Sequence, residues 1–177
     1  MVEAMLDPVE HSRIIADEQQ VCTTAGVQAR FLRSSMTGFC GPDEVEWVKK
    51  FWQHHAEGMP GLVLEGISRP DTRCQAIAGA LVRNFIDARV IPLNTILNMA
   101  SDGGVPSPSV LLIPNLFMSA MGKNVPAWRI QILYDLLLER STQGKESVVY
   151  VEDLKSLVHV YGVPFRDFLE GFRLIHD

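Results

Sequence analysis

The stretch from Gly61 to Ile86, GLVLEGISRPDTRCQAIAGALVRNFI, constrains the fold of this chain more than any other part of the sequence. A short apolar run, Leu62 to Leu64, ends at Gly66, an irregular polar loop follows, and an Ala-rich helical pattern begins at Arg73. A strand, a loop and a helix in this order are the setting that a phosphate-binding loop requires. We therefore expect a strand–loop–helix unit of an α/β protein here.

The loop of this unit lacks the residue types that bind phosphate. When the pattern G-x-x-x-x-G-K-[ST] is read from Gly66, its second glycine falls on Asp71, its lysine on Thr72 and its hydroxyl residue on Arg73. Phosphate binding needs free backbone N–H groups, a cation and a hydroxyl for Mg²⁺, whereas Asp71 would direct a carboxylate at the same space. We expect a degenerate nucleotide site that does not bind ATP in the ordinary way.

The composition is that of a globular protein and argues against several other classes. With 177 residues, 47% of them hydrophobic and 21% charged, the chain is long enough to bury one sizeable core. A net charge of −5 argues against a whole-surface nucleic-acid binder, and three cysteines without metal-like spacing predict reduced thiols and no metal site. The first residues lack the pattern of a signal peptide, and no apolar run approaches a membrane span, so we expect a cytoplasmic protein.

Strand-like and helix-like segments alternate along the chain, as in a mostly parallel sheet with helices on both faces. We expect residues 1–24 to be a weakly structured or helical extension and residues 25–177 to be a single α/β domain. The predicted strands are 62–66, 109–117 and 147–151, residues 90–99 are predicted to be a strand followed by a short helix, and the predicted helices are 44–56, 73–88, 126–143, 153–161 and 165–174.

The order of these segments resembles a known family over roughly Ala25 to Phe172. AGVQARFLRSSMTGF precedes a helix, MPGLVLEG leads into the loop, and SVLLIPNLF, YDLLLER, GKESVVYVED and LKSLVHVYG follow in that order. This order resembles the AAA+ ATPase domain of bacterial replicative-helicase loaders and the related ATP-binding subunits of insertion-sequence transposases. The resemblance implies a three-layer, P-loop NTPase-like sheet with helices on both faces.

The chain departs from the family wherever the family pattern carries catalysis. The acidic pair of the Walker B strand is replaced by Pro114 and Asn115, which supply no negative oxygen for Mg²⁺. At the family's sensor position, Glu152 and Asp153 would repel phosphate. Arg166 is our candidate for the family's trans-acting arginine, with an ordinary surface arginine as the alternative. We therefore expect no ATPase activity, no cofactor and no metal.

Several of these features have a plainer interpretation. The stretch from Gly66 to Arg73 also fits a βα turn of an unrelated α/β protein. Arg69 and Arg73, with Arg83 and Arg89, are candidates for contacting an anion or for solvated helix charges. For the neighbouring His54 and His55 we expect a surface cation pair at the end of a helix.

The segment 25–39 is our candidate for a protein contact. Its apolar residues, Phe31, Leu32, Met36 and Phe39, are interrupted by serine, threonine and glycine, so one regular element is not expected to bury them all. The alternative is that these side chains cover the edge of the sheet within the domain.

Three functions follow from the sequence. The first is a non-catalytic, AAA+-like adaptor or accessory protein in DNA replication, helicase loading or mobile-element function. Its expected partners are proteins of the replication or transposition machinery, such as a helicase, with self-association and weak DNA contact in addition. The second is an atypical nucleotide- or nucleic-acid-binding module in which Arg69 and Arg73 replace the Walker lysine. The third, an unrelated α/β enzyme, lacks a nucleophile–base pair or a metal cluster in the sequence.

Overall fold

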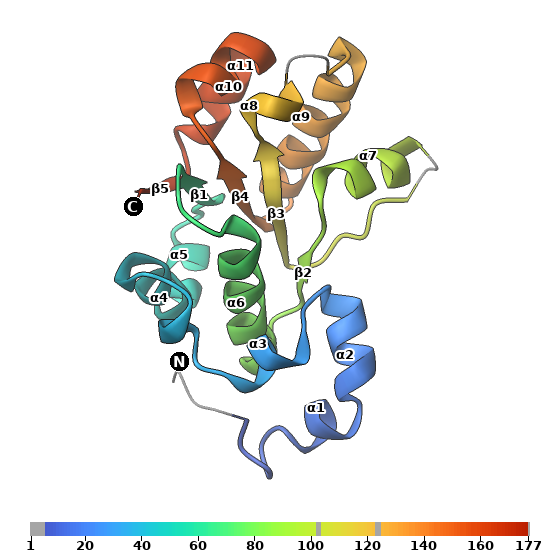
Figure 1. Ribbon diagram of the computed structural model, residues 1–177, viewed down its shortest axis with the longest axis vertical. Coiled ribbons are helices and arrows are strands. Elements are labelled where there is room, and N and C mark those ends of the chain that lie inside the picture. Colours follow the sequence, from blue (N-terminus) through green and yellow to red (C-terminus); the bar gives the residue numbers. More distant parts are fainter. Residues whose placement is uncertain (1–5, 102–103, 123–124, 177) are drawn as a thin grey trace.

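The sheet of this protein is parallel throughout. The computed structural model describes residues 6–101, 104–122 and 125–176. The strands pair in the order β2-β3-β4-β1-β5, so that β4 lies between β3 and β1 (Figure 1). Their bounds are β1 Gly61–Glu65, β2 Ala88–Val90, β3 Val110–Phe117, β4 Glu146–Val151 and β5 Arg173–His176.

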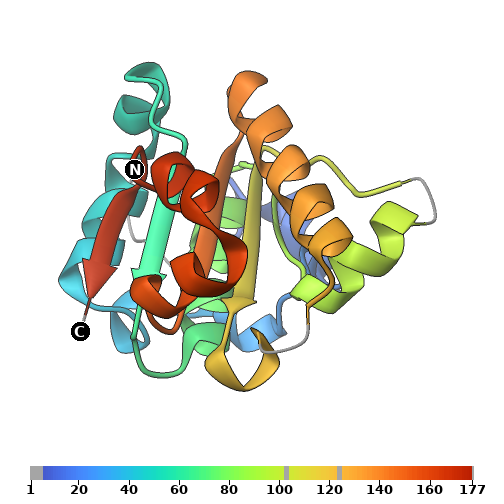
Figure 2. The same cartoon turned by 90° about the horizontal axis from the view of Figure 1, so that it is seen from above.

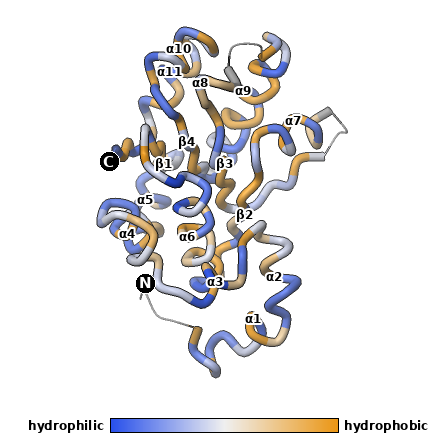
Figure 3. The backbone as a smooth tube through the Cα atoms, viewed as in Figure 1, coloured by the Kyte–Doolittle hydropathy of each residue, from blue (hydrophilic) through white to orange (hydrophobic). Residues whose placement is uncertain are grey.

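The central strands are apolar on both faces, as strands covered by helices on each side must be. Leu62 and Leu64 of β1 pack into one hydrophobic cluster, and Val63 between them packs into another. Figure 3 shows β3 and β4 as largely hydrophobic segments at the centre of the molecule. The expectation that 62–64, 110–113 and 148–151 share one parallel sheet is confirmed.

Helices cover both faces, which gives the three layers expected from the alternating segments. Helix α6 packs on the face of Leu62 and Leu64, and α9, α10 and α11 pack on the face of Val63 (Figures 1 and 2). The helices are α1 Ser12–Ala16, α2 Glu18–Ala25, α3 Ala29–Arg33, the 3₁₀ turn η1 Met36–Gly38, α4 Pro42–Lys49, α5 Phe51–Ala56, α6 Pro70–Arg83, α7 Leu93–Ser101, α8 Ser119–Gly122, α9 Ala127–Thr142, α10 Leu154–Tyr161 and α11 Val163–Leu169.

Three predicted helices differ from the structure. The helix expected over 73–88 begins at Pro70 and ends at Arg83, and Ala88 belongs to β2. The helix expected over 44–56 is interrupted at Lys50, which separates α4 from α5. The helix expected over 165–174 ends at Leu169, and β5 follows it as the edge strand beside β1. Strand β5 spans only four residues, with Ile175 buried and its neighbours more exposed, so its apolar pattern is too short to distinguish a strand from a helix.

The segment 25–39 is part of the domain interior. Phe31, Leu32 and Met36 are 1%, 0% and 2% exposed, and Phe39 is half-buried, with its ring centroid 5.0 Å from that of Phe31. The expectation that Phe31, Leu32 and Met36 contact a partner is therefore wrong, because their side chains pack within the domain. The alternative places these side chains within the domain, over the edge of the sheet. They do lie within the domain, but α3 packs against α6, which covers one face of the sheet.

Two residues of α6 hold this segment in place. A Cβ atom on Gly79 would lie 2.4 Å from the carbonyl oxygen of Phe31, so only glycine lets α3 approach α6 this closely. Arg83 Nη1 donates hydrogen bonds to the carbonyl oxygens of Phe31 and Leu32, at 2.8 and 3.0 Å. Arg83 is thus a buried structural residue, not an anion ligand.

The residues before the segment form α1 and α2, which pack beside α6. His11 Nε2 lies 2.9 Å from the carbonyl oxygen of Arg83, and the His11 ring is buried. Within the described ranges, no helix is long and apolar enough to cross a membrane.

Candidate functional site

The predicted loop lies where the direction of the sheet connections changes. After β1 the chain turns into α6 on one face of the sheet, and after the neighbouring strand β4 it turns into α10 on the other face. Ligands of open parallel sheets bind in the crevice at such a point, outside the carboxyl ends of the strands. The loop 66–69 and the residues that follow β4 form this edge (Figure 1).

The backbone of the loop offers few groups to an anion. Gly66 adopts a left-handed φ of 62°, and its N–H donates to the carbonyl oxygen of Val151 at 2.9 Å. Arg69, exposed at the N-cap of α6, also has a left-handed φ of 53°. Pro70 begins the helix and has no N–H to donate. The first turn of α6 therefore lacks one of the donors with which a helix N-terminus binds phosphate.

Arg73 already has a carboxylate partner. Its Nη1 lies 2.6 Å from Glu44 Oε1, and the two side chains are 12% and 1% exposed. Removing one member of a buried pair costs about 3–5 kcal/mol, because the other charge stays buried without compensation. Arg73 therefore acts as a link between α6 and α4, and it would have to give up this link to bind a phosphate.

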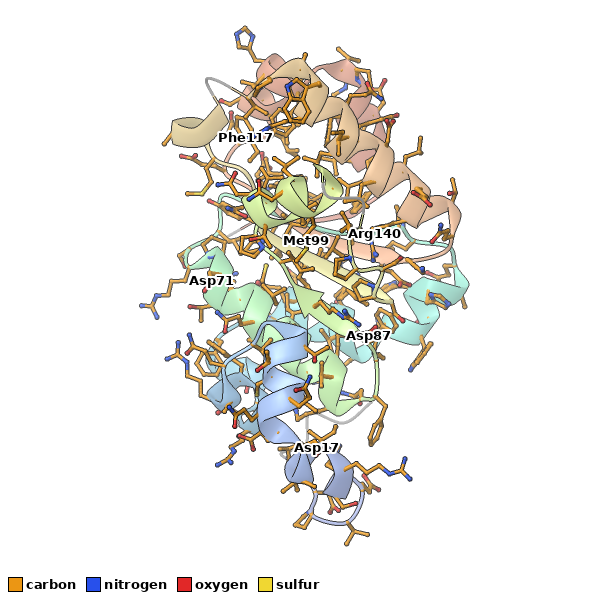
Figure 4. All side chains as sticks on the ribbon, turned by 90° about the vertical axis from the view of Figure 1, so that its right-hand side faces the viewer. Asp17, Asp71, Asp87, Met99, Phe117 and Arg140 are labelled. Atoms are coloured by element: carbon orange, nitrogen blue, oxygen red, sulfur yellow. The ribbon has the colours of Figure 1, made fainter. Side chains whose placement is uncertain are left out.

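Asp71 and Gln75 connect the loop helix to the segment 25–39. Gln75 Nε2 donates to Asp71 Oδ2 at 2.8 Å, and Gln75 Oε1 accepts the N–H of Gln28 at 3.1 Å. Asp71, labelled in Figure 4, is exposed at the start of α6, and Thr72 beside it is half-buried. A cavity of about 520 Å³ adjoins this connection, and α2, residues 26–29 and Gln75 line it.

Pro114 and Asn115 are structural residues of β3. Pro114 is buried and interrupts the ladder with β4, where the register shifts between Ile113 and Phe117. Asn115 Oδ1 accepts the N–H of Leu93 at 2.8 Å, at the start of α7. Asn115 thus stabilises a helix terminus at the position where the family pattern has a metal-binding carboxylate.

Three carboxylates gather at the ends of β1 and β4. Glu65 Oε1 accepts the N–H of Leu154 at 2.8 Å, and Glu152 Oε2 accepts the N–H of Ser119 at 2.5 Å. Asp153 caps α10, and hydrogen bonds from the side chain and backbone of Ser156 lower the pKa of Asp153. These negative groups disfavour an anionic ligand at this edge.

Glu65 has a second contact, because His176 Nδ1 of β5 lies 3.0 Å from its Oε2. The carboxylates stabilise helix starts and the edge strand, and no group of metal-ligating side chains occurs among the residues that the structure describes. The sequence does not indicate the bonding roles of Glu44, Glu65 and Gln75, because their partners lie 29, 89 and 47 residues away along the chain.

Arg166 lies on α11. It is exposed, and its Nη2 lies 2.8 Å from Asp167 Oδ1, with Glu170 on the next turn. The hydrogen bond to Asp167 raises the pKa of Arg166. This environment is that of a surface ion pair. The histidines also differ from expectation: His54 is buried, and His55 Nδ1 lies 2.5 Å from Glu146 Oε1.

Comparisons with known proteins support the fold. No protein-family model matches the chain, and no curated protein matches it. A solved structure of AMPPCP-bound DnaA from Aquifex aeolicus is similar, with a TM-score of 0.58, 8% sequence identity and coverage of 80% of this chain. The similarity covers 49% of the DnaA chain. The protein therefore has the three-layer, P-loop NTPase-like α/β fold that the resemblance implied.

Proposed function

We propose that this protein is a non-catalytic, AAA+-like accessory or adaptor protein that acts through protein contacts in DNA replication, helicase loading or mobile-element function. The observation that carries the proposal is the chemistry of the loop at the carboxyl edge. The side chain nearest in type to the Walker lysine, Arg73, is paired with the buried Glu44, and the metal-ligand positions hold Pro114 and Asn115.

The fold and the degenerate loop together support this proposal. The DnaA structure that shares the fold contains AMPPCP. This chain has the sheet, the switch point and the strand–loop–helix unit, but Arg73 and Gln75 of α6 are bonded to other parts of the domain. A protein retained for its surfaces, and not for turnover of nucleotide, would have this combination.

Partners are expected among the proteins of replication or transposition, such as a helicase, with self-association and weak DNA contact as further modes. A test is affinity capture from the native host with ATP, with ADP and without nucleotide, followed by mass spectrometry. We expect the same replication or transposition proteins in all three samples. Partners that are retained only with ATP would contradict a non-catalytic role.

One observation favours a second candidate, an atypical nucleotide-binding module. Arg69 is exposed and keeps a left-handed backbone that is uncommon for residues other than glycine. Its guanidinium could approach a phosphate at the edge of the sheet without breaking the Arg73–Glu44 pair. This candidate requires micromolar Mg-ATP binding that Arg69→Ala abolishes.

A further inference from the structure

A groove lies at the opposite end of the sheet from the degenerate loop. It has a volume of about 380 Å³ and runs between α1 and α2 on one side and the end of α6 with the start of β2 on the other. Its apolar lining includes Ile14, Val21, Ala25, Val82, Phe85 and Ile86. Residues of α1, α2 and α6 form most of its walls, and Ala88 of the edge strand β2 completes the lining.

Phe85 is the most exposed apolar side chain that lines this groove. It is 68% exposed, and its ring stacks on His11 with centroids 5.4 Å apart. It directly follows the C-cap Asn84 of α6 with a left-handed φ of 60°, and the next residue, Ile86, donates its N–H to the carbonyl oxygen of Leu81. Glycine is the usual residue at this position of a helix end. An exposed aromatic side chain therefore occupies a position whose backbone conformation favours glycine.

A smaller cavity continues the groove on the other side of Phe85. Its volume is about 200 Å³, and it shares Phe85, Ile86 and Asp87 with the groove. Trp52, which is 59% exposed, lines it. Two exposed aromatic side chains thus belong to one continuous surface, and such residues are typical anchors of protein interfaces.

The surroundings of the groove are acidic. Residues 6–25 contain Asp7, Glu10, Asp17 and Glu18 but only one arginine, Arg13. Glu18 is paired with Arg33 of α3, and Asp87, which lines the groove, is paired with Arg89. Lys145 adds a positive charge at the smaller cavity, so the excess of negative charge comes from Asp7, Glu10 and Asp17. Figure 4 labels Asp17, at the junction of α1 and α2, and Asp87, just after α6; the groove lies between the elements that carry them.

We propose that this groove docks an amphipathic helix of a partner protein whose apolar stripe is flanked by lysine or arginine. Apolar side chains at i, i+3, i+4 and i+7 would enter the groove beside Phe85, and the basic side chains would meet the carboxylates around it. The inference rests on the proposed function in one respect, that the protein acts through protein contacts.

The test uses a fluorescein-labelled peptide with leucine at i, i+3, i+4 and i+7 and lysine elsewhere. Two matched peptides serve as controls: the same residues in scrambled order, and the same order with glutamate for lysine. Fluorescence anisotropy with the full chain should show at least tenfold tighter binding of the first peptide than of either control. Equal binding of the scrambled peptide, or no binding up to about 1 mM, would overturn the proposal.

Phe85→Gly separates docking from folding. It removes the aromatic wall while placing a suitable residue in the left-handed position, so the melting temperature should stay the same or rise. Peptide affinity should fall at least tenfold. Trp128→Ala, which removes an aromatic residue of α9 that is 53% exposed, should leave affinity unchanged. Unchanged affinity in Phe85→Gly would place the peptide elsewhere and refute the groove.

Two further measurements separate this inference from its alternatives. A dimer in sedimentation equilibrium that Phe85→Gly dissociates would assign the groove to a second copy of the chain, and so contradict the proposed partner. Mg-ATP binding on the same protein reports on the proposed function by itself. Absence of both peptide and ATP binding would refute the groove alone, whereas micromolar ATP binding would refute the non-catalytic role.

Discussion

At the residue scale, Arg73, in the first turn of α6 after the loop 66–69, is a cation with a structural role. Its guanidinium contacts Glu44, whose side chain is 1% exposed, so the pair lies largely out of water. In such a place the attraction between the two charges offsets their loss of hydration only while both are present. The pair therefore ties the start of α6 to α4.

Glu44→Gln should show the cost of removing the Glu44 carboxylate from Arg73. We expect the free energy of unfolding, measured with urea, to fall by about 3 kcal/mol, because a buried guanidinium loses its counter-charge. The double variant Glu44→Leu, Arg73→Met should lose less, since it removes both charges. Glu46→Gln is the control, because Glu46 pairs with Lys50 and Arg173 at the surface and should matter much less. A Glu44→Gln protein as stable as wild type would contradict the structural role of the pair.

The buried Tyr161 should make the free energy of unfolding depend on pH in the alkaline range. Its hydroxyl donates to the carbonyl oxygen of Leu116 at 3.0 Å, and burial raises its pKa to about 12. The unfolded chain loses this proton near the ordinary pKa of 10, so above that pH the folded state binds more protons and stability falls as pH rises. The loss should continue up to about pH 12 and then stop.

Tyr161→Phe checks this assignment. Its stability should be lower than that of wild type by about 1 kcal/mol at neutral pH, because the Leu116 carbonyl loses its donor. Between pH 10 and 12, however, its unfolding free energy should decline less steeply than that of wild type. Parallel declines of the two proteins over this range would show that Tyr161 does not cause the alkaline loss.

At the element scale, the sequence predicts those parts whose pattern is long or chemically marked. SVLLIPNLF predicts a strand because a strand buried on both faces needs a continuous apolar run. Asp153 predicts the start of α10, since its side chain caps the helix. Strand β5 could not be predicted, because its four residues gain their pairing only from β1, more than a hundred positions earlier.

The same limit applies to the candidate site. The departures at Asp71, Thr72, Pro114 and Asn115 are visible in the sequence because each replaces a chemical requirement. The bonds made by side chains at the start of α6 could not be predicted from the sequence, since Glu44 and Gln75 carry no local signal of their partners. The burial of Phe31 likewise depends on Gly79 and Arg83 of α6, which lie far along the chain.

Gly79→Ala should destabilise the contact between α3 and α6. Alanine ordinarily favours a helix over glycine by about 1 kcal/mol, but here its Cβ would lie 2.4 Å from the Phe31 carbonyl oxygen, a backbone atom. We expect the free energy of unfolding to fall by about 2 kcal/mol or more, since overpacking costs of order 1–3 kcal/mol. Gly38→Ala, with no atom within 4 Å of the added Cβ, is the matched control. A gain in stability in Gly79→Ala would contradict the close approach.

At the scale of the whole molecule, the two ends of the sheet have different chemistry. The carboxyl end holds the strand–loop–helix unit, with its polar side chains bonded within the domain and carboxylates around it. The amino end carries the groove, two exposed aromatic residues and an acidic surround. This division is what we expect of a protein that keeps a nucleotide-binding fold for its surfaces.

Calorimetry of the full chain with Mg-ATP tests the central claim most directly. The loop lacks a lysine and a second glycine, and β3 lacks the metal carboxylates, so we predict no binding tighter than about millimolar. Arg69→Ala and Arg73→Ala should then titrate like wild type, although the second variant is expected to be less stable. Micromolar binding of Mg-ATP by wild type that is lost in either variant would contradict the non-catalytic account and establish an arginine as the phosphate ligand.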